Sequence, residues 1–229
     1  MAYIYKKPFT MKTTYLLVVL FFLFFTSCDW FDSANKDDDS GTIGGSSSIS
    51  VNTVGNTFLN SVQINGISFA ANSSITVTKV ENGVATIGVK SKLPANNALV
   101  NLIAAKYKDA SGNLDCTGKV KMTDEGILDY TNKDEAPFVL VKYDAKVGDK
   151  YVLEKSDGSK ITREVVRKST ADDYYWGGMM IKTIDVEQDS RIPGIKKIVY
   201  FTNHKFGLVG VRLYMEDGTT SQLYLSSTK

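Results

Sequence analysis

The chain has 229 residues, of which 43% are hydrophobic and 23% are charged, with 27 Lys and Arg against 25 Asp and Glu. This composition is typical of a globular protein and excludes a disordered or collagen-like chain. Only one long apolar run occurs, which excludes a multi-pass membrane protein. The near balance of charge argues against nucleic-acid binding, which depends on a strong basic excess on one face.

The first element in chain order is an N-terminal targeting segment. Lys6, Lys7 and Lys12 precede an apolar run over residues 15–25, and small residues follow it. This order of regions is that of a secretory signal peptide, and the run is shorter than the roughly 20 residues that a membrane-spanning helix needs. We therefore predict that residues 1–27 are a signal peptide that is removed on export.

A cysteine follows the small residues directly, in Phe25-Thr26-Ser27-Cys28. This motif resembles the lipobox of bacterial lipoproteins, with Phe25 and Ser27 where the commonest form has Leu and Gly or Ala. The resemblance implies that the Cys28 thiol receives a diacylglycerol, that the chain is cut before Cys28, and that the new amine is acylated. The membrane is then a partner through a lipid anchor and is not spanned. The alternative is ordinary cleavage near this point, which leaves Cys28 as a free thiol.

Residues 28–50 are predicted to be a flexible tether, acidic in its first half and rich in Gly and Ser in its second half. Residues 29–39 carry five Asp against one Lys, and such a block stays solvated. An acidic tract after a lipidated cysteine resembles the export signal of Bacteroidota-type surface lipoproteins. That resemblance implies a Gram-negative bacterium and display on the outer face of the outer membrane. A plain linker is the alternative, which leaves the periplasmic face open as well.

Residues 51–229 are predicted to form a single β domain, because short stretches of β-branched and aromatic residues alternate with turn signals. Three hairpins are expected where strand patterns flank such a signal: residues 74–78 and 84–90 around Asn82-Gly83, residues 150–155 and 160–168 around residues 156–159, and residues 208–215 and 221–225 around Asp217-Gly218. Further strands are expected at residues 61–65, 138–143, 179–186 and 196–202.

The helix signal is confined to residues 97–107, which fit a strand almost as well. Sequential hairpins without a βαβ rhythm predict an all-β fold. We expect an antiparallel meander that closes into a β-sandwich, barrel or half-barrel, with at most one short helix. The turn-rich residues 108–137 mark an alternative boundary between two subdomains.

The residue inventory offers no set of catalytic or metal-binding side chains. Beyond Cys28 the chain has one cysteine, Cys116, and His204 is its one histidine, so we expect no metal and no cofactor. No nucleophile-elbow, zinc-protease or phosphate-loop motif occurs. We therefore expect no enzyme and no catalytic residue. The alternative is a glycan hydrolase with two carboxylates beside residues 174–176.

The densest unusual segment is Asp173-Tyr174-Tyr175-Trp176, which two glycines follow. Flat aromatic faces stack on sugar rings or apolar ligands, and Tyr hydroxyls and a carboxylate fix the orientation of such ligands. These four residues and His204, which is predicted to lie at a turn, are the candidate ligand-binding residues. The competing interpretations are aromatics that fill the core and a turn histidine that bonds the backbone.

The leading functional hypothesis is a non-catalytic binding or accessory module that presents its β domain to a glycan, a protein or another envelope component. The alternative is a periplasmic carrier of a lipid or other apolar ligand in a barrel or half-barrel. A carrier of that kind predicts a large dry cavity lined by apolar residues.

Overall fold

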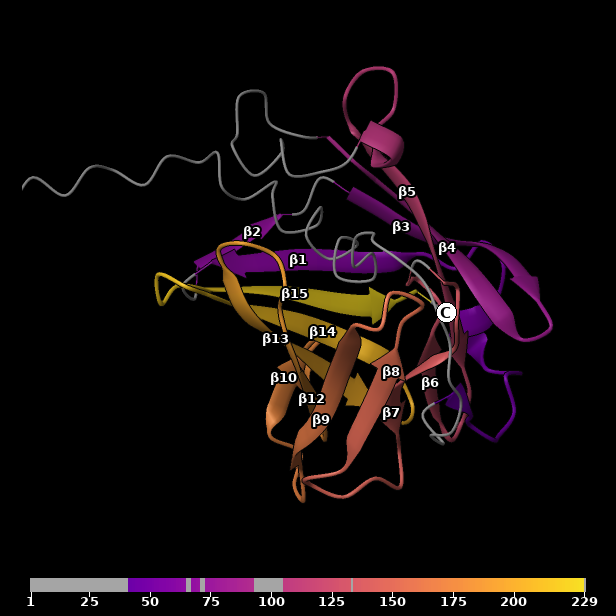
Figure 1. The fold of residues 1–229 in the computed structure, drawn as a ribbon, viewed down its shortest axis with the longest axis vertical. Helices are drawn as coiled ribbons and strands as arrows, with labels where there is room; N and C mark the ends of the chain where they lie inside the picture. The colour runs from indigo at the N-terminus through magenta and orange to yellow at the C-terminus, as the bar shows by residue number, and fades with distance from the viewer. Residues whose placement is uncertain (1–40, 65–66, 71–72, 93–104, 133, 229) are drawn as a thin grey trace, which may run out of the picture.

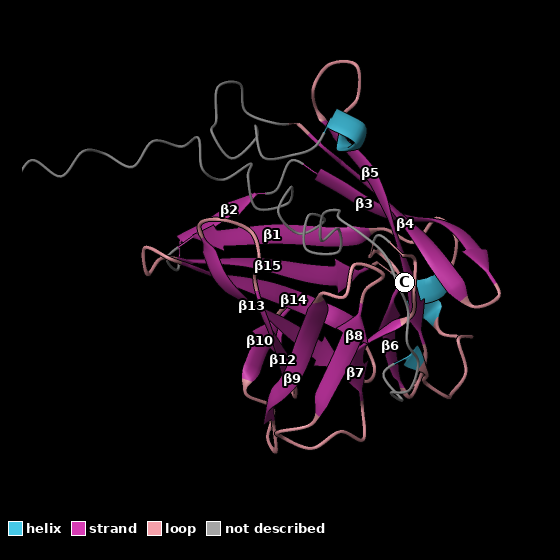
Figure 2. Cartoon of the chain, in the orientation of Figure 1, coloured by secondary structure: helices cyan, strands magenta, loops and turns pink. Residues whose placement is uncertain are grey.

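The computed structural model describes residues 41–64, 67–70, 73–92, 105–132 and 134–228. Within them the chain forms two antiparallel β-sheets and a separate short hairpin (Figure 1). The helical residues in this part are short 3-10 turns, among them Ser50–Asn52 and Ala105–Tyr107, and strands dominate (Figure 2). No helix among the described residues is long and apolar enough to cross a membrane. The predicted signal peptide, Cys28, the acidic half of the tether and most of residues 97–107 lie outside the described residues.

The larger sheet has eight strands, in the spatial order β2 (Ile67–Ala70), β1 (Phe58–Ile64), β15 (Thr220–Ser227), β14 (Gly207–Met215), β13 (Ile195–Asn203), β12 (Ile184–Asp189), β9 (Lys160–Lys168) and β8 (Lys150–Glu154). The smaller sheet has five, in the order β3 (Ser73–Glu81), β4 (Val84–Ser91), β5 (Leu114–Met122), β6 (Gly126–Asp129) and β7 (Phe138–Lys142). The separate hairpin consists of β10 (Tyr174–Trp176) and β11 (Met179–Ile181). The predicted all-β class is thus confirmed, as a sandwich of two sheets.

The three hairpins predicted from their turn residues are confirmed as β3–β4, β8–β9 and β14–β15. Asn82 and Gly83 have φ angles of 50° and 77°, the positive values that a type I′ turn requires. Asp157 and Asp217 each accept a hydrogen bond from the backbone nitrogen two residues on, at 2.8 and 2.9 Å. Such local side-chain bonds hold the turns that join these strands.

Four strands were not predicted: β2, β5, β6 and β10. Of these, β5 and β6 lie within the turn-rich residues 108–137. They occupy the middle of the smaller sheet, where β5 pairs with β4 and β6, and β6 pairs with β7. In β5 the buried positions are Leu114, Cys116, Gly118 and Met122, so a glycine interrupts the apolar side of the alternation. The strand predicted at residues 179–186 is in fact two strands, β11 and β12, in different sheets.

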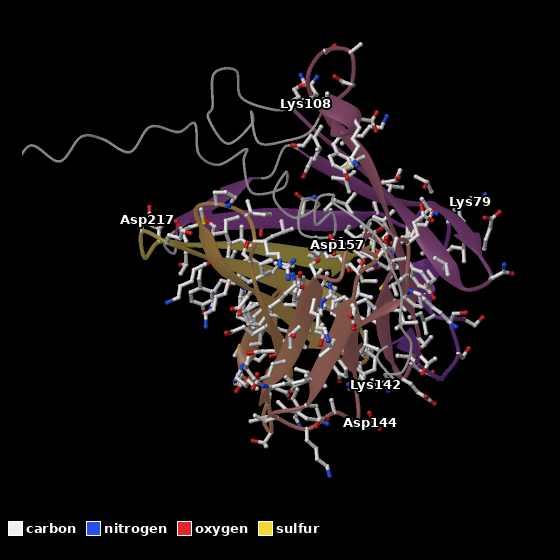
Figure 3. All side chains as sticks on the ribbon, in the orientation of Figure 1. Lys79, Lys108, Lys142, Asp144, Asp157 and Asp217 are labelled. Carbon is white, nitrogen blue, oxygen red and sulfur yellow. The ribbon has the colours of Figure 1, made fainter. Side chains whose placement is uncertain are left out.

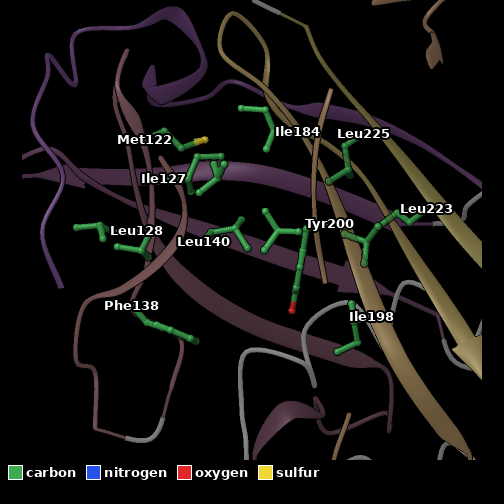
Figure 4. Packing of buried hydrophobic residues seen from close by; sticks show 14 of the residues in the cluster. Met122, Ile127, Leu128, Phe138, Leu140, Ile184, Ile198, Tyr200, Leu223 and Leu225 are labelled. Carbon is green, nitrogen blue, oxygen red and sulfur yellow. The ribbon is translucent and has the colours of Figure 1, made fainter. Parts of the chain in front are cut away.

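The core fills the space between the two sheets. Tyr200, Ile198 and Leu223 of the larger sheet share it with Ile127 and Leu140 of the smaller sheet (Figure 4). All five are at most 2% exposed. Full burial of a side chain of this size stabilises a fold by about 1.5–3 kcal/mol. The sandwich therefore depends on this layer, and Cys116, the cysteine that the structure describes, is buried without a disulfide.

A register shift in β14 places Val209 on the other side of the sheet from Val211 and Leu213. Strict alternation along residues 208–215 predicts all three on one face. The pairing of β13 with β14 shifts between Phe201 and Thr202, so Val209 packs with Phe201 on the outer face. Val211 and Leu213 stay in the core between the sheets. The outer face, which is the face of the larger sheet turned away from the smaller one, thus has an apolar end.

A buried ion pair joins the two sheets. Arg163 of β9 donates from Nη2 to Oδ2 of Asp129 in β6 at 2.8 Å, and from Nε to Gln188 at 2.9 Å. The guanidinium carbon lies 4.0 Å from the centre of the Phe138 ring. Both charged side chains are at most 3% exposed, so the attraction between them is needed to offset the free-energy cost of removing each charge from water.

Residues 41–50, the Gly- and Ser-rich end of the predicted tether, contact the domain. The backbone nitrogen of Ser46 donates to Asp124 Oδ1 at 2.7 Å. The Asn52 amide donates to the carbonyls of Ser47 and Met122, at 2.7 and 2.9 Å. Ile43 also packs against the core. This end of the predicted tether therefore packs against the β domain.

Candidate ligand-binding surface

The β10–β11 hairpin packs on the outer face of the larger sheet. Together they form a small second core, which we call the outer cluster. The hairpin contributes Tyr174, Trp176 and Ile181, and the sheet contributes Val199, Phe201 and Val209. The Trp176 indole nitrogen donates to the backbone carbonyl of Leu225, which fixes the hairpin to β15. The hairpin is thus held by apolar packing and by a hydrogen bond to the sheet.

Tyr174 and Trp176 point toward the sheet. The Tyr174 ring stacks on Phe201 with centroids 4.9 Å apart, and the Trp176 ring lies 4.4 Å from that of Phe206. Their exposed fractions are 8% and 6%. Burial raises the pKa of the Tyr174 hydroxyl well above its usual value. Both residues therefore act as anchors of the hairpin, which is the packing interpretation of this aromatic run.

Tyr175 points the other way. It is 66% exposed, and it pairs across the hairpin with Met180, which is 49% exposed, as is Met179. Successive residues of a strand face opposite sides, so the burial of Tyr174 and Trp176 places Tyr175 in solvent. Tyr175 and Met180 thus form an exposed apolar patch on the solvent side of the hairpin, which we call the hairpin patch.

Asp173 is engaged in an ion pair beside the hairpin. Its carboxylate accepts a hydrogen bond from Ser169 Oγ at 2.8 Å and one from the Arg167 guanidinium. These two bonds hold the pKa of Asp173 below its usual value. Arg167 also donates to Asp185 at 3.2 Å. The general acid of glycan hydrolysis needs a raised pKa, so the lowered pKa of Asp173 does not suit that role.

His204 lies exposed in the turn between β13 and β14. The Asn203 side chain holds that turn by accepting bonds from the backbone nitrogens of Lys205 and Phe206, at 2.8 and 3.1 Å. The His204 ring meets the Tyr143 ring edge-on, with centroids 6.5 Å apart. The turn reaches the hairpin through Phe206, which contacts Trp176. The structure thus gathers Tyr174 and Trp176 into the outer cluster, and leaves Tyr175 and His204 at the surface.

A row of polar and aromatic side chains next to the hairpin was not predicted. We call it the polar strip; it lies on the outer face across three neighbouring strands and consists of Gln63, Arg212, Tyr214, Gln222 and Tyr224. Arg212 Nε donates to Gln222 Oε1 at 2.7 Å, and the Gln222 amide donates to the Tyr174 hydroxyl at 2.8 Å. The Tyr224 hydroxyl donates to Gln63 at 3.2 Å. The polar strip and the hairpin therefore form one connected surface.

Arg212 has no carboxylate partner among the described residues. Besides Gln222, its guanidinium contacts the Phe201 ring, 5.1 Å from its centre. Its neighbour Lys197 differs, because its ammonium is paired with Glu187 at 2.6 Å and lies 4.9 Å from the centre of the Tyr214 ring. Hydrogen bonding to Glu187 raises the pKa of Lys197. The polar strip therefore carries one cation whose charge is not balanced locally.

Elsewhere charged side chains are spread over the periphery, with Lys79, Lys108 and Asp217 at separate edges (Figure 3). A surface groove of about 810 Å³ runs between residues 42–44 and residues 142–144, with Asp124 and Glu125 along it. Across the described ranges, no group of three or more His, Cys, Asp or Glu side chains is arranged to hold a metal ion.

The space between the sheets contains an apolar cavity of about 50 Å³. Its lining includes Phe58, Ile75, Leu140, Leu208 and Leu225. Pockets that hold drug-sized ligands usually have about 300–1,000 Å³, so this cavity is far too small for a lipid chain. This cavity therefore does not match the large dry cavity expected of an apolar-ligand carrier.

No protein-family model matches the chain, and no curated protein matches it. Among solved structures, the chain is similar to a protein from Bacteroides fragilis that is described as exported and as having a YmcC-like fold. The two are 12% identical, with a TM-score of 0.44, and the match covers 78% of this chain and 97% of that one. A similarity of this degree carries no argument about function.

Proposed function

We propose that this chain is a lipid-anchored lipoprotein of the outer membrane, and that its β-sandwich is a non-catalytic module that binds a glycan, a protein or another envelope component. The support for the anchor is the order of the N-terminal regions, which ends at Cys28. Each CH₂ group of an acyl chain contributes about 0.8 kcal/mol of membrane binding, so several chains give a firm anchor.

The observation that carries the binding role is the continuity of the hairpin patch with the polar strip. Aromatic, Met and Arg side chains are the residue types most enriched in recognition surfaces. Here Tyr175 and Met180 stand in solvent, while the hairpin below them is fixed by Trp176. A rigid support of this kind lowers the entropic cost of binding, since few side chains must be ordered when the ligand arrives.

The anchor is tested by expressing the full chain and a Cys28→Ala variant, with metabolic labelling by radioactive palmitate. We expect label and membrane association in the wild type, and neither in the variant. Cys116→Ala is the matched control, because it removes the other cysteine and leaves the anchor. Label in the Cys28→Ala variant, or membrane association that is unchanged, contradicts the proposal.

The face of the membrane is tested by protease treatment of intact cells. Loss of the wild-type domain without lysis indicates display at the cell surface, and protection until the envelope is opened indicates the periplasmic face. The binding role is tested by cross-linking on the same cells through a photoreactive residue in place of Tyr175. We expect a discrete adduct, and its absence from both Tyr175 and a second position at Met180 contradicts a role for this surface.

A further inference from the structure

We propose that Arg212 binds the carboxylate of an acidic sugar residue, and that Tyr214 and Tyr224 hold the sugar ring beside it. This inference deepens the proposed binding function and rests on it, because it names the ligand as a glycan that contains uronic acid.

Arg212 is a half-buried cation of the outer face, and it has no acidic partner within the described residues. Several cations in the neighbouring strands of this face are paired: Lys197 with Glu187, Lys150 with Glu164, and Arg167 with Asp173 and Asp185. A charge that is partly removed from water without a counter-ion is unfavourable. An anionic ligand is therefore expected to bind more favourably to Arg212 than to cations that already have a carboxylate partner.

The Arg212 side chain is also held in place. Both Nε and Nη2 donate to Oε1 of Gln222, which is 4% exposed, and the Gln222 amide is fixed in turn by the Tyr174 hydroxyl. The Phe201 ring lies under the guanidinium. Nη1 makes no hydrogen bond to any residue that the structure describes. A planar guanidinium held on one side and open on the other is suited to a carboxylate, which it recognises through directed N–H groups.

The flanking residues favour a sugar. Tyr214 follows Arg212 by two residues on β14, and Tyr224 follows Gln222 by two residues on β15, so both lie on the face that carries Arg212. Both rings are partly exposed. Tyrosine rings stack on the apolar faces of sugars, and the hydroxyl oxygen of Tyr224, which donates to Gln63, can accept a hydrogen bond from a sugar hydroxyl. An acidic peptide would use the cation but would gain little from two flat rings.

The test is isothermal titration calorimetry on the full mature chain in detergent. The probes are tetrasaccharides of galacturonic, glucuronic and mannuronic acid, each as the free acid and as the methyl ester, and a short poly-L-glutamate. We expect at least one free acid to bind about tenfold or more tightly than its ester, since the ester removes a charge-assisted hydrogen bond. Arg212→Gln should lower the affinity for that acid to the level of the ester and leave the affinity for the ester unchanged.

Matched variants separate charge from stacking and from folding. Lys150→Gln removes a paired cation of the same face and should change the affinity for either form less than about twofold. Tyr214→Ala should weaken binding of acid and ester alike. Arg212→Lys keeps the charge without the planar fork and should bind the acid with intermediate affinity. Thermal unfolding of every variant checks that the fold is retained.

Three results overturn the inference: equal affinity for acid and ester, poly-L-glutamate that binds as tightly as the best uronate, or no binding of any uronate. Binding of ester and acid alike, with loss in Tyr214→Ala, would still support a glycan-binding module. Failure of the proposed function is distinguished by the palmitate and cross-linking experiments, whose outcomes do not depend on these probes.

Discussion

Gly210 lies directly against the hydroxyl of Tyr174, so that a Cβ at residue 210 would be 2.5 Å from the Tyr174 oxygen. The same Cβ would be 3.0 Å from the carbonyl oxygen of Leu223 in the neighbouring strand. The hairpin can therefore lie flat on β14 only because this position has no side chain. The need is steric, since the φ angle of Gly210 is not positive.

Gly210→Ala is expected to destabilise the domain by about 1–3 kcal/mol, the usual cost of forcing an extra methyl group into a packed site. Urea unfolding followed by circular dichroism measures the effect. Gly41→Ala is the control, because its nearest neighbours are 3.6 Å away and its φ is not positive. Tyr174→Phe removes the oxygen that the methyl group meets, so it should recover part of the loss in the double variant. Equal stability of Gly210→Ala and wild type contradicts this packing.

The Arg163–Asp129 pair is expected to be the most sensitive charged site of the fold. Arg163→Met leaves Asp129 buried without its partner and should cost about 3–5 kcal/mol in the free energy of unfolding. Replacing both residues, as Arg163→Met with Asp129→Leu, should cost less than Arg163→Met alone, because no charge then stays buried. Lys150→Met, which breaks an exposed pair, should cost less than about 1 kcal/mol. If Arg163→Met has an effect as small as that, the two sheets are not joined by this pair.

The hairpins were predictable because their signals are local. Asn82-Gly83 and Asp217-Gly218 specify turns within four residues, and the flanking strands alternate clearly. The strand β5 was missed because Gly118 interrupts its alternation, and β6 because it has only four residues and all of them are buried. Both strands are stabilised by pairing with a neighbouring strand on each side, which their local sequence does not reveal. The shift at Val209 arises from the pairing of β13 with β14, which no single strand pattern contains.

The candidate surface was only partly predictable for the same reason. The run Tyr174-Tyr175-Trp176 is unusual in composition, which is why it was predicted as a candidate site. The alternation of side chains along a strand does not determine which of these residues face water. Packing on Phe201 decided that Tyr175 is the exposed residue. Arg212 can be identified as a candidate only from the structure, in which β1, β15 and β14 pair and Arg212 lies opposite Gln222. Its sequence signal is weak, because a single Arg in a strand is usually a solvated side chain.

Tyr175 and Trp176 are adjacent but should respond oppositely to truncation. Tyr175→Ala should change the free energy of unfolding by no more than about 0.5 kcal/mol, because its ring is mostly in solvent. Trp176→Ala should cost about 3–5 kcal/mol, because its ring fills the outer cluster. In a Trp30→Phe background, Trp176 is the single tryptophan, and its emission should be blue-shifted in the folded protein and red-shifted in urea. Similar costs for the two alanine variants would show that the hairpin is not seated on the sheet.

Stability is expected to fall at alkaline pH, with a contribution from Cys116. Burial, and to a lesser degree the charge of Asp115, raises the pKa of the Cys116 thiol from its ordinary value of 9.0 to about 12. A folded-state pKa above the unfolded value means that the native state holds this proton more tightly, so the stabilisation is complete below pH 9 and is lost between about pH 9 and about pH 12. Buried Tyr200 acts in the same direction, since burial raises its pKa to about 12. Urea unfolding at a series of pH values from 8 to about 11 should show this decline, and Cys116→Ala should make it shallower. The thiol should also react slowly with a disulfide reagent near pH 8 until urea unfolds the chain, whereas rapid labelling of the folded protein would contradict the burial of Cys116.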